Sequence, residues 1–338
     1  MRKTAINEMD LSSWFLPDID RRTLRELSQR SNLRPAIHVA AVALLMAAAT
    51  AGGFLLQGSW WVLVPVLIYG NLWALCGAAL QHEVSHGTFF RSPRANTVFA
   101  HITGFMSGME ANRYRWSHYN HHSRTMLTDD PYDYEIFVAK PVDRAAWFLS
   151  FVPFGGFFLP HRALWYFQRE VTLHALGRLT PVVLELAPES EHKRIIRAAR
   201  VHVAIYVLSI VLSLVFWSWI PVVLILIPMW YGSTLLMLVG HAQHDGMAMN
   251  VLDHRLNSRS FIAGPIISFL YFHMQWHVEH HLFPQVPAQN LKGLHDAIGD
   301  QLPPPRKGLR GCYREILPAL KRQVADPDYA VAVDLEAQ

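Results

Sequence analysis

The stretch that decides the fold is "HMQWHVEHH", residues 273–281, which has four histidines in nine positions. It directly follows the apolar run "FIAGPIISFLYF", residues 261–272. Residues three and four apart share one face of an α-helix, so His277, His280 and His281 would project from the same side. His273 would share that face, although it lies deeper in the apolar run. The pattern predicts a cluster of imidazoles at the end of an apolar segment.

Two further stretches repeat this arrangement on predicted helices. "HEVSH" places His82 and His86 four residues apart, and "HYNHH" contains His118, His121 and His122. A single cluster of this kind is commonly a set of surface histidines, but three such clusters point to metal binding. Imidazole suits iron, zinc, copper and nickel, and one tetrahedral zinc needs four ligands. Eight imidazoles therefore predict two metal ions, of which two irons fit best.

The composition is that of an integral membrane protein. Hydrophobic residues make up 51% of the 338-residue chain and charged residues only 17%, against about 25% in a typical soluble domain. The net charge of +4 is too small to indicate nucleic-acid binding. Cys76 and Cys312 form neither a metal-binding pair nor an expected disulfide.

Four apolar segments are long enough to cross a bilayer, which takes roughly 20 helical residues. They form two hairpins with Trp-rich turns, and Lys and Arg lie only on the outer flanks, which places both termini and all clusters on the cytoplasmic side. Residues 98–109 are too short to span, and Pro and Gly-Gly favour an interfacial or re-entrant helix at 145–167. The predicted fold is all-α, with four transmembrane helices capped by a cytoplasmic helical domain. The predicted regions are 1–35 (cytoplasmic), 36–80 (first hairpin), 81–200 (cytoplasmic or interfacial), 201–240 (second hairpin) and 241–338 (cytoplasmic), and the predicted spans are Ala36–Gln57, Trp60–Leu80, Val201–Trp219 and Pro221–Gly240.

The three histidine boxes, their order and their spacing around two hairpins resemble the membrane fatty acid desaturase superfamily. The likeness covers roughly residues 55–300 and includes "HLFPQVPAQNLKGLH" after the third box. It implies metal ligands at His82, His86, His118, His121, His122, His277, His280 and His281. The family also uses a ligand just after the fourth span.

The stretch "GHAQHDG…NVLDHRLNSRS" offers two residues for that additional ligand. It resembles a bacterial branch related to rhizopine-type oxygenases, which favours His241, with His244 as the reserve or as a partner to another ligand. His273 is a further possible ligand or partner. The remaining histidines are expected at the surface or the membrane interface: His38, His101, His161, His174, His192, His202 and His254.

The resemblance implies a non-haem di-iron enzyme that uses O₂ and external electrons to oxidise an unactivated C–H bond. A fatty acyl desaturase of the bacterial inner membrane is the first expectation. A hydroxylase, or an oxidative demethylase acting on a lipid or a small polar substrate, shares the same site and stays open. A metal transporter is a different class, but it would place ionisable ligands near mid-membrane, whereas here the histidines lie at the ends of the predicted spans.

The sequence also bears on partners of the metal site. It contains no CxxC pair or "HPGG" haem motif, which implies a separate ferredoxin, rubredoxin or cytochrome as electron donor. Basic residues that could contact an acidic donor, or equally well lipid headgroups, are Arg91, Arg94, Arg113, Arg115, Arg306, Lys307 and Arg310. Acids that could orient the imidazoles, or simply be solvated, are Glu83, Asp129, Asp130, Asp133, Asp245 and Glu279.

Overall fold

The computed structural model describes residues 14–128, 132–136, 138, 140, 142–155 and 164–335. The chain forms two compact units, each assembled from separate segments. The first contains Met1–Arg30, Ser117–Trp147 and Leu238–Gln338, and the second contains Ser31–Trp116 and Phe148–Met237. The prediction of an essentially helical protein is confirmed, because the described strands form only one short sheet.

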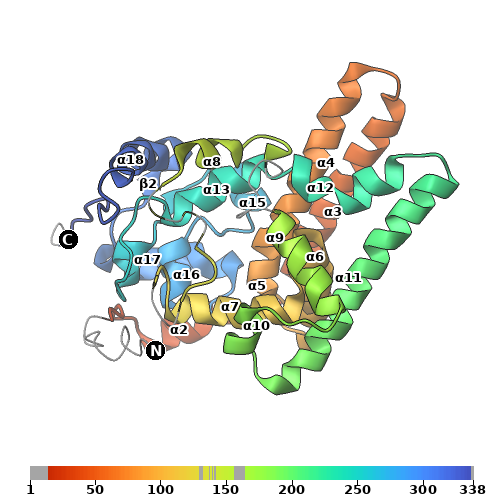
Figure 1. Cartoon of the computed structure of the whole chain (residues 1–338). Coiled ribbons are helices and arrows are strands. Elements are labelled where there is room, and N and C mark those ends of the chain that lie inside the picture. Colours follow the sequence, from red (N-terminus) through yellow and green to blue (C-terminus); the bar gives the residue numbers. More distant parts are fainter. Residues whose placement is uncertain are drawn as a thin grey trace. The chain divides into compact units, whose positions relative to one another are not determined.

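The second unit holds the long apolar helices. In Figure 1, α3 and α4 run side by side as a hairpin, and α11 is the long green helix. The 3₁₀ segment η2 leads into α4, and the π-helical segment η3 continues α4 into α5. The elements of this unit are α3 (Leu33–Leu55), η2 (Trp60–Val62), α4 (Leu63–Leu75), η3 (Cys76–Leu80), α5 (Gln81–Ser85), α6 (Pro93–Ser107), α9 (Leu164–Ala175), α10 (Pro181–Leu186), α11 (Glu189–Val215), η5 (Val222–Leu226), α12 (Pro228–Tyr231) and the first part of α7 (Ala111–Ser123).

Three described helices are long and apolar enough to span a membrane: Leu33–Leu55, Trp60–Ser85 and Glu189–Val215. In the most apolar window of the first and the third, only 17% of the residues are buried in the protein. Apolar side chains left exposed in this way need a non-aqueous surrounding, because water disfavours large apolar patches. These helices indicate association with a membrane and correspond to three of the four predicted spans.

The fourth predicted span, Pro221–Gly240, is not confirmed, because the structure has no continuous helix there. This stretch is divided into η5, α12 and the start of α13 (Thr234–His244). Pro228 lacks the N–H that would continue the preceding helix. Gly232 follows, and a Cβ atom added there would lie 1.9 Å from the carbonyl carbon of Gly70. The close approach of α12 to α4 therefore requires glycines at a position where a regular apolar helix was expected.

The first unit packs short helices around a compact core. Its elements are α2 (Arg21–Leu27), the end of α7, α8 (Arg144–Leu149), most of α13, α14 (His254–Asn257), β1 (Phe261–Ile262), α15 (Pro265–Leu270), α16 (His277–Leu282), η6 (Ala288–Asn290), α17 (Leu291–Ile298), η7 (Gly299–Gln301), β2 (Arg306–Lys307) and α18 (Gly308–Gln323). The strands β1 and β2 are parallel, with Phe261 opposite Arg306.

Apolar residues around α17 form a hydrophobic core of this unit. Leu291, Leu294 and Ile298 lie on one face of α17 and are fully buried with Val286. Their spacing of three and four is that of an amphipathic helix. Leu27 of α2 packs against the same cluster. Since Trp276 and Leu282 also belong to it, the cluster anchors both ends of α16, which carries the third histidine box.

Candidate metal centre

Four buried imidazoles of the first unit converge on one point. They are His121 of α7, His244 of α13, and His277 and His281 of α16, and one ligand atom from each lies within 4.8 Å of the others. His277 Nε2 is 2.8 Å from His244 Nε2 and 3.0 Å from His281 Nε2. We call these four residues the tetrad. Four nitrogen donors at this spacing form a set that can enclose one transition-metal ion.

Each tetrad ring is held from behind through its Nδ1 atom. Asp133 Oδ2 lies 2.9 Å from Nδ1 of His121. The Asn257 carbonyl oxygen lies 2.8 Å from Nδ1 of His244. The corresponding partner of His277 is the side-chain amide of Gln243 at 3.0 Å, and that of His281 is Thr125 Oγ1 at 3.2 Å. Such outer contacts fix the orientation of metal-binding imidazoles.

These outer partners also determine where the imidazole protons lie. A carbonyl oxygen can only accept, so His244 Nδ1 carries the proton and Nε2 keeps its lone pair. Thr125 Oγ1 donates its hydrogen to the carbonyl of His121 at 2.6 Å, and it therefore accepts from His281 Nδ1–H. In both rings the nitrogen that faces the tetrad is left as a lone-pair donor, the form that binds metal.

Burial favours the neutral form of two tetrad imidazoles. It lowers the pKa of His244 to about 3, together with neighbouring His121. It also lowers the pKa of His281 well below its usual value. Burial acts in the same direction on His121, but the carboxylates of Asp133 and Glu135 outweigh it and raise the pKa of His121. Asp133 is the matching case, since His121 and backbone N–H groups lower its pKa despite burial.

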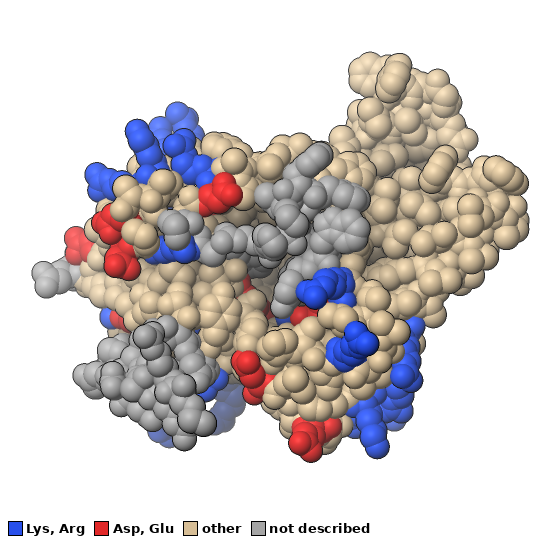
Figure 2. Space-filling view, viewed as in Figure 1, with Lys and Arg blue, Asp and Glu red and all other residues tan. Residues whose placement is uncertain are grey.

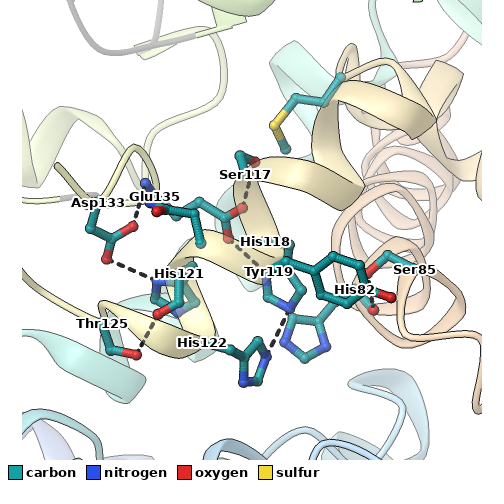
Figure 3. Close-up of polar contacts among 12 residues, drawn as sticks. His82, Ser85, Ser117, His118, Tyr119, His121, His122, Thr125, Asp133 and Glu135 are labelled. Atoms are coloured by element: carbon teal, nitrogen blue, oxygen red, sulfur yellow. Dashed lines mark hydrogen bonds and ion pairs between the residues drawn. The ribbon is translucent and has the colours of Figure 1, made fainter. Parts of the chain in front are cut away.

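A second set of buried imidazoles lies beside the tetrad in the same unit. His122 Nε2 is 3.1 Å from His118 Nε2, and His280 Nε2 is 3.1 Å from His122 Nε2. Figure 3 shows His118 and His122 together on α7, with Glu135 against His118. Glu135 Oε2 is 2.8 Å from His118 Nδ1, and Ser117 donates to the other oxygen of Glu135 at 2.8 Å. We call His118, His122 and His280 the triad.

The two sets explain the spacing of the boxes. Each HxxHH box gives residues to both sets: the i, i+4 pair goes to one and the i+3 residue to the other. In α7 the pair His118 and His122 joins the triad and His121 the tetrad. In α16 the pair His277 and His281 joins the tetrad and His280 the triad. Two helices with this spacing can therefore serve two metal positions at once.

The first histidine box lies in the second unit. His82 belongs to α5, and His86 caps it with helical backbone angles. Their rings lie 5.2 Å apart, and both come from a helix that continues a candidate span. The preceding segment η3 is π-helical, and Gly77 within it packs so tightly on α6 that a Cβ would lie 2.8 Å from the Ser107 nitrogen. A π-helical segment of this kind frequently marks a functional site.

His244, and not His241, belongs to the tetrad. The prediction favoured His241, which directly follows the predicted fourth span. In the structure its Nδ1 lies 2.9 Å from Asp245 Oδ2, and its ring lies 5.5 Å from that of Trp147. His244 Nε2, by contrast, lies 2.8 Å from His277 Nε2, so the two histidines of one helix meet different neighbours. Sequence position alone could not decide between them, because both are buried in the same helix.

His273 does not share a helix face with His277, contrary to the prediction. α15 ends at Leu270 and α16 begins only at His277. The backbone of His273 has φ 64°, in the left-handed region, so no helix passes through it. Its Nδ1 lies 3.0 Å from Ser268 Oγ instead.

Four of the histidines that were expected at a surface or membrane interface are buried: His38, His174, His202 and His254. His174 Nε2 contacts Thr180 Oγ1 at 2.9 Å, far along the chain from the boxes. His254, unlike His174, lies beside a histidine box, since its ring is 4.9 Å from that of His281. Burial lowers the pKa of His254 to about 4, offset in part by Asn257. His161 lies outside the described residues.

The predicted acidic partners have separate roles. Asp133 contacts the tetrad, whereas Asp245 contacts His241 and Trp147 Nε1. Glu279 contacts Ser260 and His295, both at 2.5 Å, and not a histidine of the boxes. Glu83 lies 3.4 Å from His82 Nδ1, and Asp129 and Asp130 lie outside the described residues. Four of these partners carry no signal that the sequence prediction used: Thr125, Glu135, Gln243 and Asn257. Of these, Glu135 lies in the acidic run "DDPYDYE" that follows the second box, which is a usable signal.

Glu110 positions the start of α7. Its carboxylate accepts from the backbone N–H groups of Asn112 at 3.0 Å and Arg113 at 2.9 Å. Burial raises the pKa of Glu110 to about 7, and these hydrogen bonds and the Arg113 charge offset only part of that effect. The Arg113 guanidinium is itself buried and paired with Glu170 at 2.6 Å. A buried polar network thus fixes the helix that carries the second box.

The donors present fit a transition metal. The rings present nitrogen only, they are nearly inaccessible to water, and their outer nitrogens are oriented by separate groups. Iron, zinc, copper and nickel all accept such ligands. The Nε2 atoms of His244, His277 and His281 meet at about 3 Å, so several nitrogen lone pairs are directed to one point that a shared ion would satisfy.

Comparison with known proteins agrees with this geometry. The model of the fatty acid desaturase family matches residues 58–311. The chain belongs to the fatty acid desaturase family. It is 22% identical over 314 residues to a Delta(8)-fatty-acid desaturase 2 of Arabidopsis thaliana, covering 82% of this chain and 67% of that protein. It is 24% identical over 266 residues to a chloroplastic omega-3 fatty acid desaturase of Brassica napus, covering 74% of this chain and 63% of that protein.

This membership makes the chain a desaturase-type oxidoreductase that is associated with membranes and lipid metabolism. The histidine clusters are consistent with the iron that such enzymes use. The chain spans about two thirds of the length of both curated relatives.

Proposed function

We propose that the protein is a non-haem di-iron oxidase that uses O₂ and external electrons to desaturate a fatty acyl chain. The observation that carries the proposal is the convergence of seven buried imidazoles into a triad and a tetrad within one unit. Two adjacent nitrogen-rich sets provide for two metal ions. Bound iron would supply the O₂ chemistry that removes hydrogen from an unactivated C–H bond.

Each of the two sets would supply the ligands of one iron. The tetrad His121, His244, His277 and His281 would hold one iron. The triad His118, His122 and His280 would hold the other, completed by the first box, His82 and His86. The support for this last step is the sequence, since the resemblance carries the first box onto these two residues. His241 leaves the ligand set and becomes a neighbour that contacts Asp245.

The protein's own residues supply orientation and shielding. Asp133, Glu135, Thr125 and the Asn257 carbonyl hold the rings at Nδ1 and direct Nε2 to the metal positions. The low pKa of His244 keeps this ligand unprotonated at any ordinary pH. Transport of the metal is not supported, because the tetrad and triad lie on helices outside the three candidate spans.

We further propose that the termini and all three boxes face the cytoplasm and that a separate acidic redox protein delivers electrons at α18. Five basic residues of this region are exposed: Lys307, Arg310, Arg314, Lys321 and Arg322. Figure 2 shows Lys and Arg gathered over α18. We call these five the basic face. Complementary charge steers such encounters.

The opposite side of α18 leads toward the tetrad. Tyr313 donates to the carbonyl oxygen of Leu238 in α13 at 2.9 Å, and its ring lies 6.2 Å from that of Trp147. Trp147 in turn donates to Asp245, one residue after His244. A donor bound at the basic face would therefore reach the helix of a proposed ligand through packed protein.

The decisive experiment compares cell lipids and small metabolites with and without the expressed protein by mass spectrometry. Loss of two hydrogens from a fatty acyl chain supports a desaturase. Gain of an oxygen would identify a hydroxylase and loss of a methyl group a demethylase, the alternatives that share this site. A His118→Ala variant expressed to the same level is the control, and a product that it still forms would contradict the proposed site.

A further inference from the structure

A groove runs between α9 and α11, two helices of the second unit that pack against each other. Its volume is about 550 Å³. On the α9 side it is lined by Thr172, Ala175 and Leu176. The residues of α11 that line it form one stripe along the helix: Arg200, Val203, Ala204, Val207, Leu208 and Val211. We call this space the α9–α11 groove.

The groove is open at the surface and, apart from Thr172 and Arg200, its lining is apolar. Leu176 is 70% exposed and Val207 is 52% exposed. Large apolar patches are disfavoured in water, and α11 is one of the candidate membrane spans. The groove therefore fits an apolar occupant that a bilayer supplies, and a lipid acyl chain is the commonest of these.

The length of the stripe matches one leaflet of a bilayer. From Arg200 to Val211 a helix rises about 16 Å, and half of a typical hydrocarbon core is roughly 15 Å. Trp217 and Trp219, both exposed just beyond the end of α11, are residues that prefer the opposite membrane interface. Arg200 would then lie at headgroup depth and Val211 near the middle of the membrane.

Basic side chains continue the stripe beyond Arg200. Lys193 and Arg197 precede it by seven and three residues, a spacing that places all three on one face of α11. All three are exposed, and none pairs with a carboxylate among the residues that the structure describes. The neighbouring Arg194 is instead paired with Glu191 at 2.9 Å. Figure 2 shows Lys and Arg at the lower end of α11 and an uncharged surface along its upper part.

Arg200 connects the two sides of the groove. Its Nε donates to the carbonyl oxygen of Ala175 in α9 at 3.0 Å. The guanidinium makes no other hydrogen bond within the described part of the chain. Its remaining N–H groups form a planar fork that matches the oxygens of a phosphate. A phosphate at this point would complete a row of three positive charges above an apolar stripe.

We propose that the α9–α11 groove binds one anionic phospholipid of the surrounding bilayer. One acyl chain lies along the stripe from Val203 to Val211, and the phosphate contacts Arg200 and Arg197. The lipid would hold α9 against α11. Because α9 also carries Glu170, which pairs with Arg113 in the first turn of α7, a bound lipid would help to support the helix that carries the second histidine box.

The test uses the full chain in detergent, freed of lipid by repeated exchange, with phosphatidylglycerol and phosphatidylcholine of identical acyl chains as probes. Native mass spectrometry measures the number of bound lipids and their dissociation constants, and thermal unfolding confirms that each variant is folded. Arg200→Gln removes the phosphate contact, and Ala204→Trp fills the groove without changing the charge. Arg194→Gln is the matched control, because it removes the same charge from the same helix outside the groove.

We expect one phosphatidylglycerol per chain, bound at least about tenfold more tightly than phosphatidylcholine at low salt. The dissociation constant should rise at least about fivefold in Arg200→Gln, binding should be lost in Ala204→Trp, and Arg194→Gln should match the wild type.

Equal affinity for the two lipids, or equal losses in Arg200→Gln and Arg194→Gln, would overturn the proposal and leave only a general attraction to charged membrane surfaces. Unchanged binding in a folded Ala204→Trp would also overturn it, because the acyl chain would then lie elsewhere. A free fatty acid that binds at this groove in place of the phospholipid would contradict the choice of occupant.

Discussion

At the scale of single residues, the orientation of Nδ1 decides which histidines can serve the metal. His244 donates Nδ1–H to a carbonyl oxygen and turns Nε2 toward three other imidazoles. His241, three residues earlier, has a carboxylate at Nδ1 and Trp147 beside its ring. The same residue type in the same helix therefore has two roles, which are set by the neighbours that each ring meets.

The first prediction compares alanine variants of these two residues. His244→Ala should bind the second metal at least about a hundredfold more weakly and lose turnover. Loss of a residue that only orients a ligand lowers metal affinity about 10–100-fold, and loss of the ligand itself should lower it more. His241→Ala should keep two metals and retain part of the activity. Metal analysis of the purified variants measures both. A His241→Ala protein that retains only one metal would reverse the assignment.

The second prediction concerns Glu110, whose raised pKa gives a signed effect of pH on stability. An acid whose folded pKa is above its unfolded value stabilises the fold at low pH, and this contribution is lost as pH rises from about 4.5 to about 7. The shift corresponds to a change on the order of 3 kcal/mol. In Glu110→Gln this decline should vanish, since the neutral amide cannot ionise.

Thermal unfolding of the detergent-solubilised protein across this pH range tests the Glu110 prediction. The difference between wild type and Glu110→Gln should grow in favour of the variant as pH rises. Glu185→Gln, at an exposed position of α10, is the control and should follow the wild-type curve. Parallel curves for all three proteins would show that Glu110 does not ionise in this range.

At the scale of elements, the sequence predicted the helices that carry histidines far better than it predicted the breaks between apolar helices. The spacing in "HYNHH" and "HVEHH" placed α7 and α16 correctly, because spacings of three and four are specific to a helix. Hydropathy alone did not reveal that residues 221–240 are interrupted, since Pro228 and Gly232 are compatible with an apolar segment. Their effect depends on α4, a partner that the sequence pattern cannot identify.

The third prediction tests that contact. A Cβ on Gly232 would overlap Gly70, whose own added Cβ would lie 2.3 Å from Tyr231. Gly232→Ala should therefore destabilise the second unit by about 1–3 kcal/mol, the usual cost of overpacking. Gly53→Ala is the control: nothing lies within 4 Å of its added Cβ in α3, and it should be neutral or slightly stabilising. Equal melting temperatures for both variants would contradict the contact.

At the scale of the whole molecule, the second and third histidine boxes lie in the first unit, and the three candidate spans and the first box lie in the second. The sequence predicted the histidine clusters, and their assignment to two metals stays a prediction. It could not predict which cluster member serves which set, since the division of each box depends on how α7, α13 and α16 pack. His254 was likewise assigned to a surface, because a lone histidine in "NVLDHRLNSRS" gives no periodic signal.

The fourth prediction concerns electron delivery at the basic face. A double variant, Arg314→Glu with Lys321→Glu, should raise the KM for an acidic ferredoxin by at least about tenfold, because charge steering is lost. The KM of the variant should also depend less on salt concentration than that of the wild type. Turnover with a small chemical reductant should be unchanged, since these exposed side chains lie away from the tetrad. Arg194→Glu, exposed on α11, is the control. An equal loss with both reductants would show that the variants damage the fold instead.

The proposed function requires two metal ions held by imidazoles within one chain. Its most direct test is the iron content of wild-type protein, prepared with adequate iron, combined with Mössbauer spectroscopy of the ⁵⁷Fe-loaded protein. We expect two irons per chain with nitrogen-rich coordination, falling to one in His244→Ala. One iron or fewer per wild-type chain at full occupancy, or spectra showing carboxylate-dominated ligation, would contradict the account.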